Sequence, residues 1–185
     1  MINKEWQVIL AGEGGQGLVF IGALLGEAAV IDGKNAAQSA SYTIASRGGF
    51  TTADVVISTE EISFPEVTEP DVVLALSPES LAKYSDILKP ECLLIYDSVL
   101  VGGPTGKNRI ALPLGKTVKK AAAEGRRASL NLVGLGAVLG IAEIVSWDSV
   151  RKALQNRFSS EALVRANWET LQSGADLVKD IKIKG

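Results

Sequence analysis

The chain has 185 residues and a net charge of −2, so its overall charge gives no attraction to nucleic acid or to an anionic membrane. Hydrophobic residues make up 46% and charged residues 22% of the sequence, which indicates a globular protein with a sizeable core and excludes a disordered chain. Histidine is absent and Cys92 is the only cysteine, which excludes an intrachain disulfide, disfavours a metal or iron–sulfur site, and removes the commonest general base.

In the first third of the chain, apolar segments typical of strands flank a helical pattern. "WQVILAG" predicts a strand over 6–12, the glycines of 14–17 predict a turn, and apolar spacing predicts a helix from Leu18 to near Gly33. A weaker strand follows over 35–40, and a polar loop over 41–49 leads into the strongly β-type segment 50–58.

The rest of the chain moves from strands to helices. Strands are predicted over 71–76, 92–97 and 109–113, with Cys92 as a buried apolar residue at the start of the second. Ser77 and Pro78 are typical of a helix start. From Leu114 the patterns are helical: 115–125, 131–145, and two amphipathic segments starting near Ser146 and Ser159.

This order of elements predicts an α/β fold: a Rossmann-like, doubly wound and mostly parallel sheet with a helical C-terminal third. We expect one domain over 1–185, with its helical part over about 114–182. The N-terminus has no signal-peptide pattern, and the longest apolar segment, 130–145, is interrupted by Asn131 and Glu143 and too short to span a bilayer. We therefore expect a cytoplasmic protein with neither membrane nor nucleic-acid partners.

The glycine loop between the first strand and first helix is the first candidate site. Its glycines, Gly12, Gly14 and Gly17, have the spacing of a dinucleotide-binding loop, and a helix N-terminus favours anions. However, no acidic residue occurs in "NAAQSAS" to hold a ribose, and Gln16, after the extra Gly15, is bulky for a pyrophosphate site. Three interpretations stay open: a dinucleotide site, a tight structural turn, and a receptor for another anion or another subunit's backbone.

The second candidate site is the loop "SRGG", where Arg47 precedes Gly48. We expect this loop at the carboxyl edge of the sheet, where ligands of open α/β sheets bind. An arginine there is suited to a carboxylate or phosphate, or else to an ion pair on the surface or between subunits. Small residues four apart, Gly22 with Gly26 and Gly136 with Gly140, predict close helix–sheet packing or a flat subunit interface.

Taken together, these motifs resemble the gamma subunit of the 2-oxoacid:ferredoxin (acceptor) oxidoreductases. "GEGGQG" with its helix, "SY…SRGG…ADVVIS", "PDVVLALSPES", "NLVGLGAVLG" and "RANWETLQSGAD" occur in that order, and the resemblance covers about 8–175. Members often have a glycine and an acidic residue where this chain has Thr43 to Ser46, so a contact made by that acid is not expected here. "EEISFP" and "PDVVLALS" favour the 2-oxoglutarate type, whereas "TIASRGG" is also similar to indolepyruvate-type relatives.

The resemblance implies a non-catalytic gamma subunit of a complex that decarboxylates a 2-oxoacid to an acyl-CoA and CO2, with ferredoxin as acceptor. It implies alpha and beta partner chains, with a ferredoxin-like delta chain in some complexes, and places thiamine diphosphate, Mg²⁺ and iron–sulfur clusters outside this chain. We expect the isolated chain to be inactive, without catalytic or metal-binding residues. Its candidate contacts to CoA, another anion or a subunit are Gly12, Gly14, Gly15, Gln16, Gly17, Arg47 and Gly48. The alternative is a stand-alone Rossmann-type module for a nucleotide or CoA, or a dehydrogenase.

Overall fold

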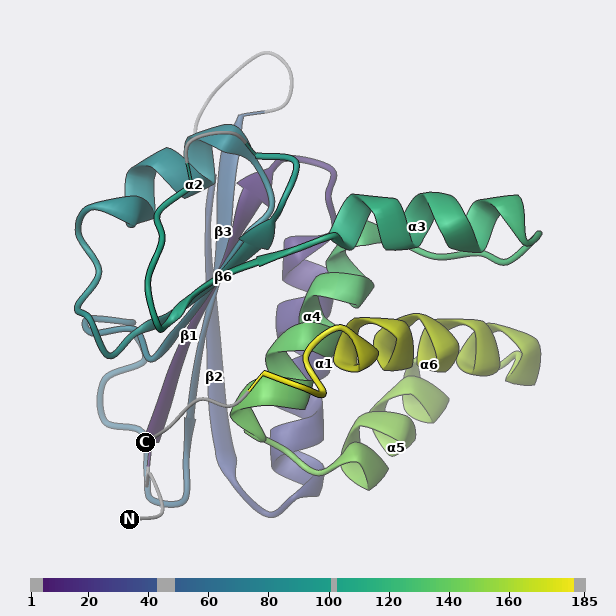
Figure 1. Ribbon diagram of the computed structural model, residues 1–185. Coiled ribbons are helices and arrows are strands. Elements are labelled where there is room, and N and C mark those ends of the chain that lie inside the picture. Colours follow the sequence, from purple (N-terminus) through teal and green to yellow (C-terminus); the bar gives the residue numbers. More distant parts are fainter. Residues whose placement is uncertain (1–4, 43–48, 101–102, 182–185) are drawn as a thin grey trace.

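The computed structural model describes residues 5–42, 49–100 and 103–181 (Figure 1). One six-stranded sheet lies at its centre, in the order β2-β3-β1-β4-β5-β6. Its strands are β1 (Glu5–Glu13), β2 (Asn35–Tyr42), β3 (Phe50–Ser58), β4 (Val72–Ala75), β5 (Leu93–Asp97) and β6 (Arg109–Leu112). These are the strands that the sequence predicts, with small shifts at their ends.

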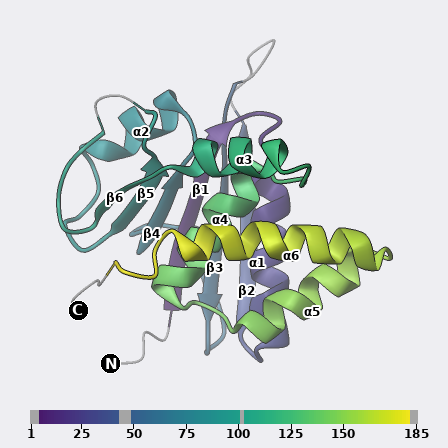
Figure 2. The ribbon, with the colours of Figure 1, turned by 45° about the vertical axis from the view of Figure 1, so that its right-hand side comes forward.

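Six helices are described, and they cover the two faces of the sheet unequally. They are α1 (Leu18–Ile31), α2 (Pro78–Ser85), α3 (Leu114–Ala123), α4 (Leu130–Ala142), α5 (Trp147–Arg157) and α6 (Glu161–Asp176). Helices α1 and α4 lie directly on one face; α5 packs on α1, α6 packs on α4, and α3 lies beside α4 (Figures 1 and 2). On the other face, α2 is the only helix among the residues that the structure describes. No helix in 5–42, 49–100 or 103–181 is both long and apolar enough to cross a membrane.

The fold class is α/β as expected, with one strand reversed. Strands β1, β4, β5 and β6 are parallel neighbours, whereas β3 is antiparallel to both β1 and β2. Strand β3 therefore lies between β1 and β2, where a regular dinucleotide-binding sheet would pair β1 with β2 directly. As a result, the carboxyl end of β2 lies two strands away from the glycine loop.

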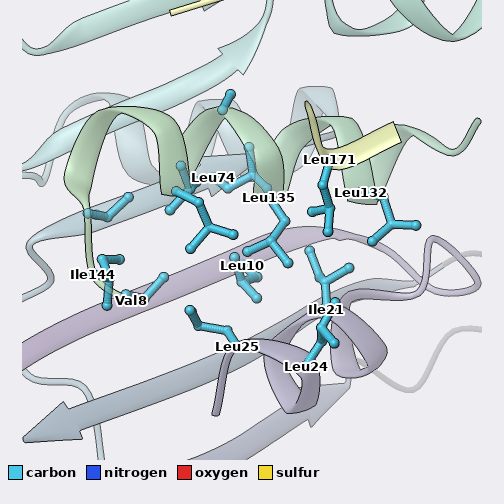
Figure 3. Packing of buried hydrophobic residues seen from close by; sticks show 14 of the residues in the cluster. Val8, Leu10, Ile21, Leu24, Leu25, Leu74, Leu132, Leu135, Ile144 and Leu171 are labelled. Atoms are coloured by element: carbon cyan, nitrogen blue, oxygen red, sulfur yellow. The ribbon is translucent and has the colours of Figure 1, made fainter. Parts of the chain in front are cut away.

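The main core lies between the sheet and the helices α1 and α4. Leu10 on β1 is fully buried between Ile21 of α1 and Leu135 of α4 (Figure 3). Alternate residues of the same strand face the other side, where Ile9 packs with Leu81 of α2. This period-two alternation explains why residues 8–11 of β1 are all apolar: this part of the strand is buried on both faces.

The two glycine pairs that the sequence singles out have different packing roles. A Cβ at Gly22 would meet Gln38 and Ala53, and one at Gly26 would lie 3.7 Å from Ala36, so this pair packs α1 on the sheet, as predicted. A Cβ at Gly136 would instead lie 1.9 Å from the carbonyl oxygen of Leu171 on α6. The second pair therefore brings two helices together rather than a helix and the sheet.

Candidate functional site

The glycine loop lies at a topological switch point of the sheet. Strands β1 and β4 are parallel neighbours, but the chain leaves β1 for α1 on one face and leaves β4 for α2 on the other (Figure 1). In open α/β sheets such a divergence opens a crevice at the carboxyl ends of the two strands, where ligands bind. Residues 13–17 lie at this switch point, where the chain passes from β1 to α1.

The side chain of Gln16 bridges the ends of β1 and β4 at this point. Its Oε1 accepts a 2.8 Å hydrogen bond from the backbone N–H of Glu13, and its Nε2 donates a 3.3 Å bond to the carbonyl of Leu76, just past β4. A Cβ on Gly12 would lie 2.1 Å from Oε1, so the fold of this side chain requires glycine at that position. Gln16 thus links the carboxyl ends of β1 and β4.

Gly17 begins α1 and is held from the opposite side by α4. It has φ 72° and ψ 31°, in the left-handed region that favours glycine. Asn131, only 8% exposed, donates a 3.1 Å hydrogen bond from Nδ2 to the carbonyl of Gly17, and a Cβ at Gly17 would lie 2.6 Å from that nitrogen. The starts of α1 and α4 are therefore fixed beside each other.

The structure brings the first candidate loop to the end of the second. The N–H of Gly14 donates a 2.9 Å hydrogen bond to the carbonyl of Gly49, which directly precedes β3. Gly15 has φ 90°, and no atom of the described residues lies within 4 Å of the position its Cβ would take. Arg47 and Gly48 lie outside the described residues.

A buried carboxylate fixes the next part of the same sheet edge. Asp97, 4% exposed at the end of β5, accepts a 2.9 Å hydrogen bond from the N–H of Gly115 and a 3.3 Å bond from the N–H of Val99. The first of these bonds satisfies an amide in the first turn of α3, which has no side-chain cap of its own. Asp97 therefore holds the start of α3 in place through the hydrogen bond from Gly115.

The chemistry available at this edge is anion binding by backbone amides. Helix α1 starts without a side-chain cap or an acidic residue in its first turn, so the amides of that turn are available to a negative group. Among the described residues, no three His, Cys, Asp or Glu side chains are close enough to hold a metal ion. Burial raises the pKa of Cys92 to about 11, despite the opposing charge of Arg109, so this thiol is a poor nucleophile and a poor ligand.

A second group of titratable side chains lies on the α2 face of the sheet. Burial raises the pKa of Asp54, although a hydrogen bond from Thr52 and the charge of Lys83 oppose this shift. Burial, together with the charge of Asp54, also raises the pKa of Tyr84 to about 12. Lys83 lies 4.3 Å from the centre of the Phe50 ring, and Phe50 pairs with Glu13 of β1, so this group is packed against the sheet beside the start of the glycine loop.

Sequence reasoning finds the glycine loop but misses the residue that fastens it to α4. Asn131 stands out in the sequence only as a polar interruption of the apolar segment 130–145. A buried polar side chain needs a hydrogen-bond partner, so an asparagine within an apolar segment indicates a contact of this kind. The partner, Gly17, is 114 residues away and could not be identified from the sequence alone.

Comparison with known proteins identifies what the chain is similar to. Residues 7–177 match the family model described as pyruvate ferredoxin/flavodoxin oxidoreductase. The chain is 35% identical over 156 residues to the 2-oxoglutarate synthase subunit KorC of Methanocaldococcus jannaschii, covering 83% of each chain. It is 30% identical over 175 residues to the ketoisovalerate oxidoreductase subunit VorA of Methanothermobacter marburgensis, covering 94% of this chain and 36% of that longer one.

A solved structure has the same fold over nearly the whole chain. The gamma subunit of a keto/oxoacid ferredoxin oxidoreductase from Geobacter sulfurreducens superimposes with a TM-score of 0.78 at 34% identity. The match covers 96% of this chain and 98% of that one. This chain and that gamma subunit therefore share one fold over nearly their whole lengths.

Proposed function

The chain belongs to the pyruvate ferredoxin/flavodoxin oxidoreductase family as a gamma-type subunit of a multi-subunit 2-oxoacid:ferredoxin oxidoreductase, and we propose that its complex acts on 2-oxoglutarate. The observation that carries the proposed substrate is the similarity to KorC, a 2-oxoglutarate synthase subunit, over 83% of both chains. The complex would convert 2-oxoglutarate and CoA into succinyl-CoA and CO2, passing two electrons to ferredoxin. Alpha and beta chains, and in some complexes a ferredoxin-like delta chain, would supply the rest of the assembly.

This chain is the non-catalytic member of the complex. Thiamine diphosphate with Mg²⁺ would supply the decarboxylation chemistry, and iron–sulfur clusters the electron transfer. The described residues do not fit these groups: the one thiol is buried with a raised pKa, and no cluster of three metal-ligating side chains occurs among them. The other subunits would hold these cofactors, and the isolated gamma chain would be inactive.

The contribution of this chain is to complete the assembly and part of the CoA-facing surface. The uncapped start of α1, the open backbone at Gly15 and the contact between Gly14 and Gly49 support an anion-receptive edge at the glycine loop. The phosphates of CoA, or a backbone carbonyl of a partner subunit, have the polarity that this edge accepts. The candidate contacts stay Gly12, Gly14, Gly15, Gln16, Gly17, Arg47 and Gly48.

The assembly and substrate are tested by purifying the tagged chain from its native host and identifying the chains that accompany it. The complex is then assayed for CoA-dependent reduction of ferredoxin with 2-oxoglutarate, pyruvate, 2-oxoisovalerate and indolepyruvate. We expect alpha and beta chains to co-purify and 2-oxoglutarate to have the highest kcat/KM. A clear preference for another 2-oxoacid would overturn the proposed substrate but not the family.

The loops are tested by Gln16→Ala and Arg47→Ala in the reconstituted complex, with Arg126→Ala as control. Arg126 is an exposed arginine that pairs with Glu124, just past the end of α3. We expect the KM for CoA to rise about tenfold for Arg47→Ala, the loss of one charge-assisted hydrogen bond, with kcat much less affected. If neither variant changes the KM for CoA or the yield of assembled complex, both loops are structural only.

The similarity to gamma subunits does not favour a stand-alone dehydrogenase or nucleotide-binding module. Two further expectations stay predictions: a cytoplasmic location, and a single domain over 1–185 with its helical part over about 114–182.

A further inference from the structure

The glycine loop is held by hydrogen bonds to three other elements of the fold. Two of them fix it to the start of β3 and to the end of β4. The third comes from the interior, where Asn131 of α4 donates to the carbonyl of Gly17. Residues 13–15 of the loop are exposed, whereas Asn131 is 8% exposed. A group bound on the outside of the loop would therefore respond to Asn131 only through the position of the loop.

The carboxamide of Asn131 has a fixed orientation. Its Oδ1 accepts a 2.9 Å hydrogen bond from the N–H of Leu132, and its Nδ2 donates a 3.1 Å bond to the carbonyl of Gly17. Because a backbone N–H only donates and a carbonyl only accepts, the amide cannot be reversed without losing both bonds. The position therefore requires a side chain that accepts at one end and donates at the other.

Both ends of this amide bind the start of a helix. The N–H of Leu132 lies in the first turn of α4, where Ser129, the N-cap residue, makes no side-chain hydrogen bond. The carbonyl of Gly17 begins α1 and also accepts a 3.2 Å bond from the N–H of Ile21. Asn131 thus serves as the cap of α4 and holds the residue at which the loop turns into α1.

The loop depends on such a contact because of its glycines. Three of the four residues 14–17 are glycine, the residue with the widest choice of backbone conformations. A Cβ at Gly17 would lie 2.6 Å from Nδ2 of Asn131, so the amide is packed closely against this residue. The contact selects one conformation of Gly17, with φ 72°, from those that glycine can adopt.

We propose that Asn131 is a positioning residue for the glycine loop: its amide holds Gly17, and with it the exposed residues 14 and 15, in the conformation that the assembled complex uses. This inference rests on the proposed function, in which the loop receives an oxygen of CoA or of a partner subunit's backbone. Asn131 itself contacts neither, and it acts through Gly17.

Asn131→Asp is the sharpest variant because it changes only the donor end of the side chain. A carboxylate of nearly the same size keeps the bond from the N–H of Leu132, but places a second acceptor against the carbonyl of Gly17. The matched control is Thr170→Val on α6. Thr170 is 2% exposed and its hydroxyl contacts the carbonyl of Arg127 before α4, so this variant loses a buried polar group without removing a contact to the loop.

The first measurement is hydrogen exchange in the full chain alone, at the amides of Gly14 and Ile21, which bond to Gly49 and Gly17. We expect both to exchange about tenfold faster in Asn131→Asp, from the loss of one hydrogen bond, and nearly as in the wild type in Thr170→Val. Circular dichroism checks that the variants fold. If Asn131→Asp does not, Asn131→Ala takes its place, because it removes both bonds without adding an acceptor. Unchanged exchange at both amides overturns the proposal.

The second measurement uses the reconstituted complex. We expect Asn131→Asp to raise the KM for CoA about tenfold with kcat nearly unchanged if the loop contacts CoA, or to lower the yield of assembled complex if it contacts a subunit. Thr170→Val should change neither quantity. No change in either, a loss of kcat alone, or equal losses in the two variants would overturn the positioning role. If the wild-type complex does not assemble or oxidise a 2-oxoacid, the proposed function fails, and the exchange measurement still decides whether Asn131 holds the loop.

Discussion

At the scale of single residues, Asp32 shows how one carboxylate joins distant parts of the chain. It ends α1 and accepts hydrogen bonds from the Ser146 backbone N–H at 2.7 Å and from the hydroxyls of Ser146 and Ser149 at 2.7 and 2.5 Å. Lys34 lies 3.7 Å away. Burial acts to raise the pKa of Asp32, but the two serines and Lys34 outweigh it, so its pKa is below the ordinary value of 3.8.

This lowered pKa predicts a pH dependence of stability. Because the folded-state pKa is below the unfolded one, the contribution is complete above about pH 4 and is lost as pH falls through the folded-state value. We expect Asp32→Asn to unfold with a free energy lower by about 2 kcal/mol at pH 7, and with a smaller loss at pH 3. Urea unfolding at both pH values measures this difference.

The control for Asp32 is Asp176→Asn, which removes an exposed carboxylate that pairs with Lys179. A surface pair contributes at most about 1 kcal/mol, so this variant should unfold nearly as the wild type does. Equal losses for the two variants would show that the hydrogen bonds to the serines do not stabilise the protein.

Glu143 provides a second prediction, because it is the one non-glycine described with a positive φ, at 49°. It ends α4 in the left-handed conformation, which costs an ordinary residue about 1 kcal/mol and glycine almost nothing. We expect Glu143→Gly to stabilise the protein by about 0.5 kcal/mol after the extra entropy of its unfolded chain is counted. Glu143→Ala should not, since alanine keeps the strain; equal effects of the two variants in thermal unfolding would assign the change to the lost side chain.

At the scale of elements, the contact between α4 and α6 depends on two glycines that face each other's backbone. A Cβ at Gly136 would lie 1.9 Å from the carbonyl oxygen of Leu171, and one at Gly174 would lie 1.9 Å from that of Val133. Backbone atoms within a helix cannot move aside as side chains do, so the helices would have to separate. Leu171, which is fully buried at this contact, would then lose its packing.

Alanine substitutions at glycines of two helices should therefore have opposite effects. We expect Gly136→Ala to destabilise by about 3 kcal/mol or more, through overpacking. Gly26→Ala meets only Ala36 at 3.7 Å and should stabilise by about 0.5–1 kcal/mol, as expected for glycine in a helix interior. Denaturant unfolding at low protein concentration compares them; a mild effect of Gly136→Ala would mean that α6 can move away from α4 at little cost.

The elements themselves could be predicted from the sequence, but the direction of β3 was not. Apolar spacing gives the class of each segment, and caps such as Ser77 give helix starts, because both depend on neighbours in sequence. Only residues 43–49 separate β2 from β3. Parallel neighbours require a longer crossover, so this short connection indicates an antiparallel hairpin. Its insertion beside β1, and the bond between Asn131 and Gly17, depend on contacts far apart in the chain.

At the scale of the whole molecule, the sheet combines the outline of a dinucleotide-binding fold with two changes that remove its site. Gln16 bridges the ends of β1 and β4, and β3 separates β2 from β1. A ribose-binding acid at the end of β2 would thus be a full strand farther from the glycine loop, even if the sequence had one. The same glycines serve the close turn and the contact with Gly49.

This arrangement predicts that the isolated chain does not bind NAD(H) or NADP(H) at millimolar concentration. Ligands that bind only the folded state raise its melting temperature, and at 100 times Kd the gain is about 2.7 kcal/mol, so even weak binding would be measurable. We expect no shift for the wild type. Gln16→Gly, which removes the bridge between β1 and β4, should also show none, because β3 still separates the ribose position from the loop. A shift in the variant alone would show that Gln16 is the only obstacle, and a shift in the wild type would restore the nucleotide-binding interpretation of the glycine loop.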